Sequence, residues 1–180
     1  MFLYKIADEV SLKLIELQDA EQLYKLTDKS RAYLREWLPW LDRTTRIEDT
    51  KGYIQGCLQA YADNKGLFAV ILFKGEIAGV VSFNSIDWGN KTAQIGYWLD
   101  EEFQGNGIMT KAVKALVDYA FSEYKLNKVE IHAAVENQKS RSIPERLGFV
   151  REGRIREAEW LYDHYVDHYV YGMLTREWRK

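Results

Sequence analysis

The residues with the clearest chemical potential form the segment Gln104-Gly-Asn-Gly-Ile-Met-Thr110. It lies between an apolar stretch that ends at Leu99 and a helical pattern that begins near residue 107. Glycine tolerates positive φ and lets the backbone approach a ligand closely. The first turn of a helix presents unpaired N–H groups at the positive end of the helix dipole, where phosphate binds well. The segment therefore predicts an anion cradle, most simply for a pyrophosphate.

Other interpretations of this segment compete with a cradle. A plain glycine-rich connection into a core helix needs no ligand. A dinucleotide-binding fingerprint needs a tight turn directly from the strand and a small residue at position 110, whereas Asp100–Phe103 intervene and Thr110 stands there. A Walker A loop is excluded because Lys111-Ala112 does not continue as Gly-Lys-Ser/Thr. The cradle and the plain connection remain as alternatives.

A second polar group follows the apolar stretch Val129–Val135. Asn137 can offer both a donor and an acceptor to a ligand that contains amides. For a lone asparagine, a role in a turn or as a helix cap is the commoner one. Ser140 and then Leu147-Gly148-Phe149 follow at short spacing.

Taken together, these motifs resemble the GNAT acetyltransferase superfamily, and more closely its RimJ/RimL-type branch, whose named members acetylate the N-termini of ribosomal proteins. The resemblance extends from about residue 10 to about residue 175. It rests on Gln104-x-x-Gly107, Asn137-x-x-Ser140, Leu147-Gly148-Phe149, Gly79-Val-Val-Ser-Phe, Ala93-Gln-Ile-Gly-Tyr-Trp-Leu99 and the tryptophan-rich Leu34-Arg-Glu-Trp-Leu-Pro-Trp40.

The resemblance implies acetyl-CoA as cosubstrate and no metal. The strand that ends at Leu99 would pair with the pantetheine arm through its edge, and Asn137 would contact that arm. The family usually has Gly or Ala where this chain has Met109, whose side chain we expect to point into the helix packing because the cradle uses backbone. The pyrophosphate would be bound through the backbone N–H groups of the loop, that is, by Gln104, Gly105, Asn106, Gly107, Ile108, Met109 and Thr110.

The acid–base chemistry depends on the acceptor amine. An α-amino group has a pKa near 8 and needs little help at neutral pH, whereas a lysine amine, near 10.4, needs a base. The resemblance implies Ser140 as the acid and Glu159 as the base, and Trp160 and Leu161 would desolvate the Glu159 carboxylate. Many family members place a tyrosine acid at the position of Pro144, so that role is vacant here. As alternatives, Glu159 is a solvated hairpin residue, and Ser140 is a helix N-cap or a contact to a CoA phosphate.

No metal site is predicted. His164 and His168 would lie on one face of a strand, about 13 Å apart at about 3.3 Å per residue, which is too far for one ion. His132 stands apart from both, and the single Cys57 has no partner for a disulfide or a zinc site.

Hydrophobic patterning predicts one α+β domain over residues 1–180, with a largely antiparallel central sheet, and the resemblance adds a mixed, GNAT-like sheet with helices on both faces. Asp19 is the expected N-cap of the first helix, and Ser142-x-x-Glu145 is the expected capping box of the last, with Pro144 in its first turn. Strands are expected at 10–17, 67–74, 77–86, 92–99, 129–135, 149–158 and 165–174, and helices from 19, at 30–37, 47–62, 107–124 and 142–147.

Charge and hydropathy restrict the partners and the compartment. The 25 Lys and Arg against 27 Asp and Glu give a net charge of −2. This charge argues against extensive electrostatic binding to the phosphates of a nucleic acid, which needs a basic excess. The longest uncharged apolar stretches, such as Ile77–Phe83, are far too short to span a membrane. The single cysteine and the charged first ten residues favour a reducing cytoplasm.

The sequence therefore predicts a cytoplasmic, acetyl-CoA-dependent N-acetyltransferase that transfers acetyl directly, in a ternary complex, to the N-terminal amine of a protein or peptide. Branch resemblance suggests a ribosomal protein as this acceptor, and homo-oligomerisation stays open. Acetylation of a polyamine or an antibiotic, and a catalytically silent CoA-binding module, are the alternatives. The aromatic residues Tyr33, Trp37 and Trp40 would either wall the acceptor cleft or pack in the core.

Overall fold

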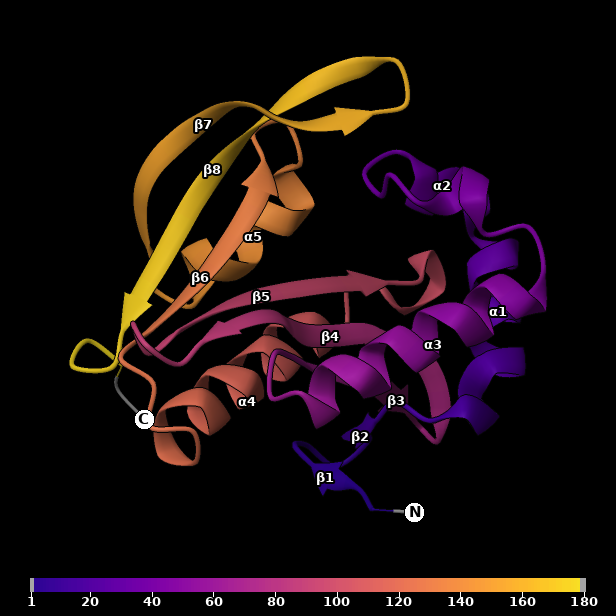
Figure 1. The fold of residues 1–180 in the computed structure, drawn as a ribbon, viewed down its shortest axis with the longest axis horizontal. Helices are drawn as coiled ribbons and strands as arrows, with labels where there is room; N and C mark the ends of the chain where they lie inside the picture. The colour runs from indigo at the N-terminus through magenta and orange to yellow at the C-terminus, as the bar shows by residue number, and fades with distance from the viewer. Residues whose placement is uncertain (1, 179–180) are drawn as a thin grey trace.

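The computed structural model describes residues 2–178 and centres on one eight-stranded sheet (Figure 1). The strand order is β1-β2-β3-β4-β5-β6-β8-β7. The strands are β1 (Tyr4–Lys5), β2 (Val10–Leu14), β3 (Leu67–Phe73), β4 (Glu76–Asp87), β5 (Thr92–Leu99), β6 (Lys128–Ala134), β7 (Val150–Leu161) and β8 (His164–Leu174). The helices are α1 (Ala20–Lys29), α2 (Arg31–Arg35), α3 (Ile47–Ala62), α4 (Ile108–Ser122) and α5 (Gln138–Arg146), with short 3₁₀ turns η1 (Leu17–Asp19), η2 (Leu41–Arg43) and η3 (Glu101–Phe103).

The sheet is mixed and largely antiparallel, as predicted. Every neighbouring pair of strands is antiparallel except β5 and β6, which are parallel. Parallel neighbours need a long crossover, and α4 provides it. The strands β3, β4 and β5 form an antiparallel meander.

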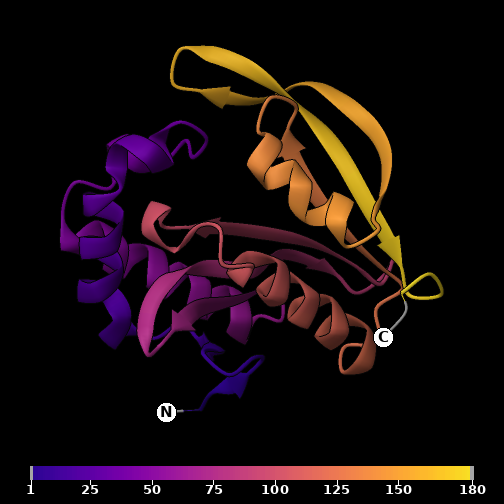
Figure 2. The ribbon, with the colours of Figure 1, turned by 180° about the vertical axis from the view of Figure 1, so that it is seen from behind.

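Helices cover both faces of the sheet, which confirms the predicted α+β class. Side chains alternate along β3, so that Val70 and Leu72 pack with α1 and α3, whereas Ala69 and Ile71 pack in the cluster that contains α4. Figure 1 shows α1 and α3 in front of the sheet. Figure 2, the view from behind, shows α4 and α5 on the opposite face. None of the helices in residues 2–178 combines the length and the apolar character needed to cross a bilayer.

The strands β5 and β6 diverge halfway along their length. They pair only from Thr92 with Lys128 to Ile95 with Ile131. Beyond this point β5 continues to Leu99 and β6 to Ala134 without pairing to each other. On its β6 side, the last half of β5 therefore offers backbone groups that the sheet does not use.

The last helix, α5, begins earlier than the sequence suggested. Its N-cap is Asn137, whose side-chain oxygen accepts a 3.1 Å hydrogen bond from the Ser140 N–H. The predicted start at Ser142 is wrong, because the Ser142 hydroxyl donates to the Lys139 carbonyl instead of capping a helix. The box from Ser142 to Glu145 therefore does not form.

Pro144 consequently lies inside α5 rather than in its first turn. Proline has no N–H, so the carbonyl four residues earlier, that of Ser140, loses its helical donor. The Tyr97 hydroxyl on β5 donates to this carbonyl at 2.8 Å. A tertiary hydrogen bond thus replaces the missing helical one, and it ties α5 to β5.

Other boundaries moved by a few residues. The first long strand ends at Leu14 rather than at residue 17, because a 3₁₀ turn begins at Leu17. Asp19 stands at the N-cap of α1 but makes no side-chain cap bond, since its carboxylate accepts from the Glu16 N–H and the buried Lys13 ammonium. The last two strands extend further than predicted, to Leu161 and from His164, and β1 was not foreseen.

Candidate active site

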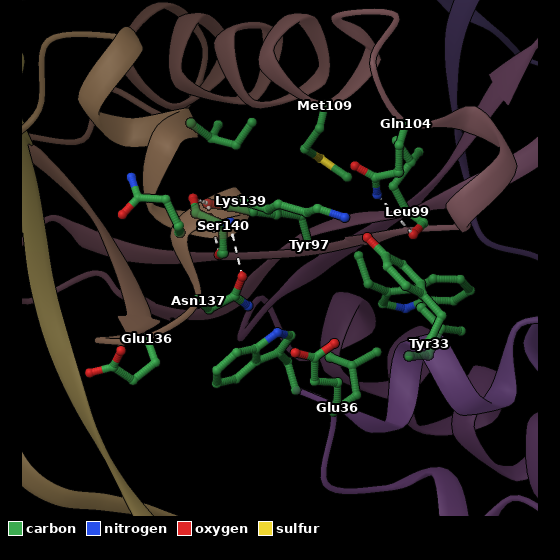
Figure 3. A pocket seen from close by; sticks show the side chains of 16 residues that line it. Tyr33, Glu36, Tyr97, Leu99, Gln104, Met109, Glu136, Asn137, Lys139 and Ser140 are labelled. Carbon is green, nitrogen blue, oxygen red and sulfur yellow. Dashed lines mark hydrogen bonds between the residues drawn. The ribbon is translucent and has the colours of Figure 1, made fainter.

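A pocket of about 360 Å³ lies where β5 and β6 diverge (Figure 3). Its walls come from the segment around α2, the end of β5, the loop before α4 and the first turn of α5. Figure 3 shows Gln104 and Met109 on the α4 side, with Tyr33 and Glu36 on the α2 side. The lining residues are Tyr33, Leu34, Glu36, Trp37, Leu38, Tyr97, Trp98, Leu99, Gln104, Met109, Glu136, Asn137, Gln138, Lys139, Ser140 and Ile143.

The structure brings five of the residues predicted for the site into this pocket. They come from three separate elements, and they are Leu99, Gln104, Met109, Asn137 and Ser140. The Gln104 amide donates to the Leu99 carbonyl at 3.3 Å, which joins the loop to the end of β5. Met109 belongs to the hydrophobic core and also lines the pocket, so its side chain serves both, not the helix packing alone.

The remaining loop residues predicted for the cradle lie directly beside the pocket. Gly105 and Gly107 have φ of 80° and 68°, and a Cβ added to either would meet nothing within 4 Å. The Asn106 side-chain amide donates to the carbonyls of Phe103 and Gln104, each at 3.3 Å, and closes the loop.

This loop fits a phosphate ligand. Within residues 2–178, the backbone N–H groups from Gly105 through Asn106, Gly107 and Ile108 to Thr110 make no hydrogen bond. They stand at the start of the fifteen-residue helix α4, where the helix dipole adds positive potential. Unpaired donors, open space and a positive dipole end are the features that a pyrophosphate requires.

Arg146, at the end of α5, adds a charge that sequence reasoning missed. Its Nη1 donates to Thr110 Oγ1 at 2.7 Å, which holds the guanidinium beside the first turn of α4. It has no carboxylate partner in the described part of the chain. Its position directly before the motif Leu147-Gly148-Phe149 is the sequence signal that could have identified it as a site residue.

Tyr97 is the second residue that sequence reasoning missed. Burial raises the pKa of its phenol well above the usual range. Besides its bond to the Ser140 carbonyl, Tyr97 Oη lies 3.4 Å from Ser140 Oγ. The N-cap is Asn137, so the alternative role of Ser140 as N-cap is excluded.

The opposite wall is aromatic and acidic. Tyr33 and Trp37 line it, whereas Trp40 packs against Trp98, with ring centroids 6.0 Å apart. The Lys139 ammonium lies 5.1 Å from the centroid of the Tyr33 ring and so connects α5 to this wall. Two carboxylates that were not predicted, Glu36 and Glu136, also line the pocket, one from each side.

Glu159, the predicted base, lies on β7 outside the residues that line the pocket. Its side chain is 31% exposed, and its Oε1 lies 3.9 Å from His168 Nε2. Trp160 is 52% exposed and packs on Tyr165, so it leaves the Glu159 carboxylate open to water. Leu161, by contrast, is buried.

The histidines make separate local contacts. His132 Nε2 lies 3.2 Å from Glu130, and His164 Nδ1 lies 2.5 Å from Asp163. Over residues 2–178, no three potential ligands among His, Cys, Asp and Glu gather around a common point.

Known proteins resemble this chain over nearly all of its length. Residues 9–150 match the family described as "Acetyltransferase (GNAT) domain". The "Putative ribosomal N-acetyltransferase YdaF" of Bacillus subtilis is 37% identical over 179 residues, which cover 99% of this chain and 98% of that protein.

Two solved structures share the fold and hold a coenzyme. One is described as "RimL- Ribosomal L7/L12 alpha-N-protein acetyltransferase in complex with Coenzyme A", with a TM-score of 0.93, 32% identity, and coverage of 96% of this chain and 98% of that one. The other is "Microcin C7 self immunity acetyltransferase MccE in complex with Acetyl-CoA and AMP", with a TM-score of 0.91, 35% identity and 94% coverage of both chains. These similarities agree with the pocket and with the unpaired N–H groups of the loop before α4. The chain belongs to the GNAT acetyltransferases and is an acetyl-CoA-dependent N-acetyltransferase.

Proposed function

We propose that this enzyme acetylates the N-terminal α-amino group of a protein, and that a ribosomal protein is its acceptor. The similarity to a putative ribosomal N-acetyltransferase and to a ribosomal L7/L12 α-N-acetyltransferase supports this acceptor class. The observation that carries the proposal is that one pocket joins the donor residues Gln104 and Leu99 to an aromatic and acidic wall with Tyr33 and Glu36. A flexible peptide end that carries an ammonium suits such a wall.

We assign the donor side as follows. Acetyl-CoA supplies the acetyl group as a thioester. The N–H groups of residues 105–110 hold the pyrophosphate, and the free edge of β5 near Leu99, together with Asn137, holds the pantetheine arm. A backbone N–H near Leu99 stabilises the negative charge that develops on the acetyl oxygen.

We assign the proton transfers to Glu159 and Ser140. Glu159 takes the proton from the acceptor amine, through water, because its carboxylate lies outside the pocket. Ser140 gives its hydroxyl proton to the departing thiolate and is reprotonated by water, to which Glu159 releases the proton taken from the amine. Tyr97, whose hydroxyl lies 3.4 Å from Ser140 Oγ, holds the serine in place. Acetyl passes directly from donor to acceptor in a ternary complex.

An acceptor panel tests the proposal. Peptides that carry ribosomal-protein N-termini, the same peptides with a blocked α-amine and an internal lysine, polyamines and aminoglycosides are each incubated with acetyl-CoA. Thiol release and product mass are recorded. We expect transfer only to free α-amines of peptides. Transfer to a polyamine or an aminoglycoside, with none to peptides, would replace the proposal with small-molecule acetylation.

We also propose that residues 1–180 form one domain that acts in the cytoplasm, where ribosomal proteins are made. All eight strands, from β1 near the N-terminus to β8 near the C-terminus, belong to one continuous sheet, which supports a single cooperative unit. Coincident unfolding curves from far-UV circular dichroism and from tryptophan fluorescence would agree with this, and two separated transitions would not. Light scattering during chromatography would reveal whether the enzyme forms a homo-oligomer.

A further inference from the structure

The tip of the β7–β8 hairpin reaches across to the segment that follows α2. Figure 1 shows this hairpin arching over towards α2. Tyr162 occupies the turn at the tip, and its hydroxyl donates to the Leu38 carbonyl. The same hydroxyl accepts a 3.2 Å hydrogen bond from the Leu41 N–H. One side chain thereby joins residues that are 121 and 124 positions apart in the chain.

The Tyr162 ring takes part as well as its hydroxyl. The Arg35 guanidinium carbon lies 3.7 Å from the ring centroid, close enough for a cation–π interaction. Two hydrogen bonds of 2.8 and 2.9 Å to Asp42 hold this guanidinium in place. We call Arg35, Asp42 and Tyr162, with the two backbone groups at Leu38 and Leu41, the hairpin clamp.

The backbone at the tip indicates that the clamp is specific. Tyr162 has a φ of 63°, which is unusual for a bulky residue and costs free energy that surrounding contacts must offset. Burial raises the pKa of its phenol above the ordinary value. A turn with Asn or Gly would form more easily here but would make none of these contacts.

The clamp holds the part of the chain that forms the α2 wall of the pocket. Glu36, Trp37 and Leu38 line the pocket, and they lie between the clamp residues Arg35 and Leu41. Arg31 supports the other side of this segment, through the Leu41 and Thr44 carbonyls. The donor loop at Gln104 and Met109 lies on the opposite side of the pocket (Figure 3).

We propose that Tyr162 is a positioning residue for the acceptor: by clamping the hairpin onto residues 35–41, it fixes the wall against which the acceptor binds. The proposal rests on the proposed function only in taking the α2 wall as the acceptor side. A wall that is ordered before binding spares the acceptor the entropic cost of ordering it. Loss of the clamp should therefore weaken acceptor binding and leave acetyl-CoA binding alone.

The first experiment separates the two substrates. In Tyr162→Ala we expect the KM for the acceptor to rise by about tenfold, since two hydrogen bonds and a cation–π contact are lost. The Kd for acetyl-CoA, measured by titration, should stay within about twofold, well below the tenfold that 1.4 kcal/mol represents. Tyr162→Phe keeps the ring over Arg35 and should give a smaller rise. Tyr165→Ala is the matched control, because Tyr165 lies on the same hairpin but packs on Trp160.

A double variant tests whether the clamp acts as a unit. Arg35→Ala should raise the acceptor KM on its own, and Arg35→Ala combined with Tyr162→Ala should add little to either change. Thermal unfolding identifies any variant that fails to fold, and Tyr162→Phe then carries the test.

A last measurement does not depend on any acceptor. The Leu41 amide donates to the Tyr162 hydroxyl, so hydrogen exchange of this amide should be faster in Tyr162→Ala than in the wild type. In Tyr165→Ala its exchange rate should equal that of the wild type. If the wild type acetylates nothing in the panel, the proposed function fails while this readout still examines the clamp. Unchanged Leu41 exchange, an unchanged acceptor KM, or a parallel loss of acetyl-CoA affinity would each overturn the proposal.

Discussion

Two carboxylates compete for the role of general base, and they differ in where they lie. Glu159 is on the hairpin, outside the pocket, next to His168. Glu136 lines the pocket directly before the α5 N-cap. A base must reach the amine directly or through one water, so matched substitutions at the two positions can separate them.

If Glu159 is the base, Glu159→Gln keeps the shape and removes the proton acceptor. With a working acceptor, kcat at pH 7 should fall by about a hundredfold, within the roughly 10²–10⁴-fold that a positioned base contributes. The loss should shrink as the pH approaches the pKa of the acceptor amine, and the Kd for acetyl-CoA should not change. Glu136→Gln serves as the comparison. A large, pH-dependent loss in Glu136→Gln, with little effect in Glu159→Gln, would transfer the role to Glu136.

Asp100 is a buried carboxyl with an incomplete set of hydrogen bonds. It follows β5 and is fully buried, and the Ser30 hydroxyl donates to its Oδ1. Its Oδ2 has no hydrogen-bond partner within residues 2–178, although the Lys29 ammonium lies 4.0 Å away. Burial therefore raises the pKa of Asp100 above the ordinary value for aspartate.

A raised pKa in the folded state has a definite effect on stability. The stability it contributes is complete below the unfolded-state pKa, near 3.9, and is lost as the pH rises through the higher folded-state value. Asp100→Asn removes the titration, so the variant should gain stability relative to the wild type between about pH 4 and pH 7. Thermal unfolding at both pH values measures this. An asparagine variant whose stability relative to the wild type does not rise from pH 4 to pH 7 would contradict the argument.

Sequence reasoning identified the residues whose function lies in short motifs and missed those that tertiary structure recruits. Leu99, Gln104 and Asn137 stand in recognisable runs, and the structure gathers them into one pocket. Tyr97 was missed because its partner, the Ser140 carbonyl, becomes available only when Pro144 falls in the middle of α5. The base and acid roles of Glu159 and Ser140 stay predictions.

Among the secondary-structure elements, the loop that leads into α4 is the one on which donor binding should depend most. Gly107 is the N-cap of α4 and has a φ of 68°. A valine there would be strained, by roughly 1–2 kcal/mol, and its side chain would project into the open space beside the cradle.

We therefore expect Gly107→Val to lower CoA affinity by at least about tenfold, equivalent to 1.4 kcal/mol, with a native circular dichroism spectrum. Gly75→Val is the matched control, because Gly75 also has a positive φ, of 86°, and open surroundings, but lies in the β3–β4 turn. Both variants should lose similar stability. Equal CoA affinity in the two would remove the loop from the donor site.

The elements themselves were predicted well where their patterns were long. The helix at 47–62 and the strand at 92–99 have the predicted bounds, because periodicity over many residues averages out local ambiguity. The two-residue strand β1 has no such pattern, and α5 was misjudged because proline was expected only in a first turn. Whether such short elements form depends on charge and packing contacts with distant parts of the molecule, and a sequence pattern does not show these contacts.

For the molecule as a whole, acetyl-CoA should stabilise the fold. A ligand bound only by the folded state adds about 2.7 kcal/mol at a concentration of 100 times its Kd. For a chain of this size, each kcal/mol raises Tm by about 2–4 °C, which gives a shift of about 5–10 °C. Differential scanning fluorimetry measures it, with NAD as the control ligand. A shift with NAD and none with acetyl-CoA would be incompatible with the donor site described above.

The short parallel pairing between β5 and β6 has a consequence for how the enzyme opens. Four residue pairs, from Thr92–Lys128 to Ile95–Ile131, are the whole ladder between the first five strands and the last three. Among the ladders from β2 to β8, one this short should open at a lower free energy than its longer neighbours, as a local opening within the cooperative fold. Amide protons along this β5–β6 seam should therefore exchange at a lower opening free energy than those between β3 and β4. A coenzyme that lies between the diverging ends of β5 and β6 would contact both strands and raise that free energy, so binding of the donor should slow amide exchange along the seam.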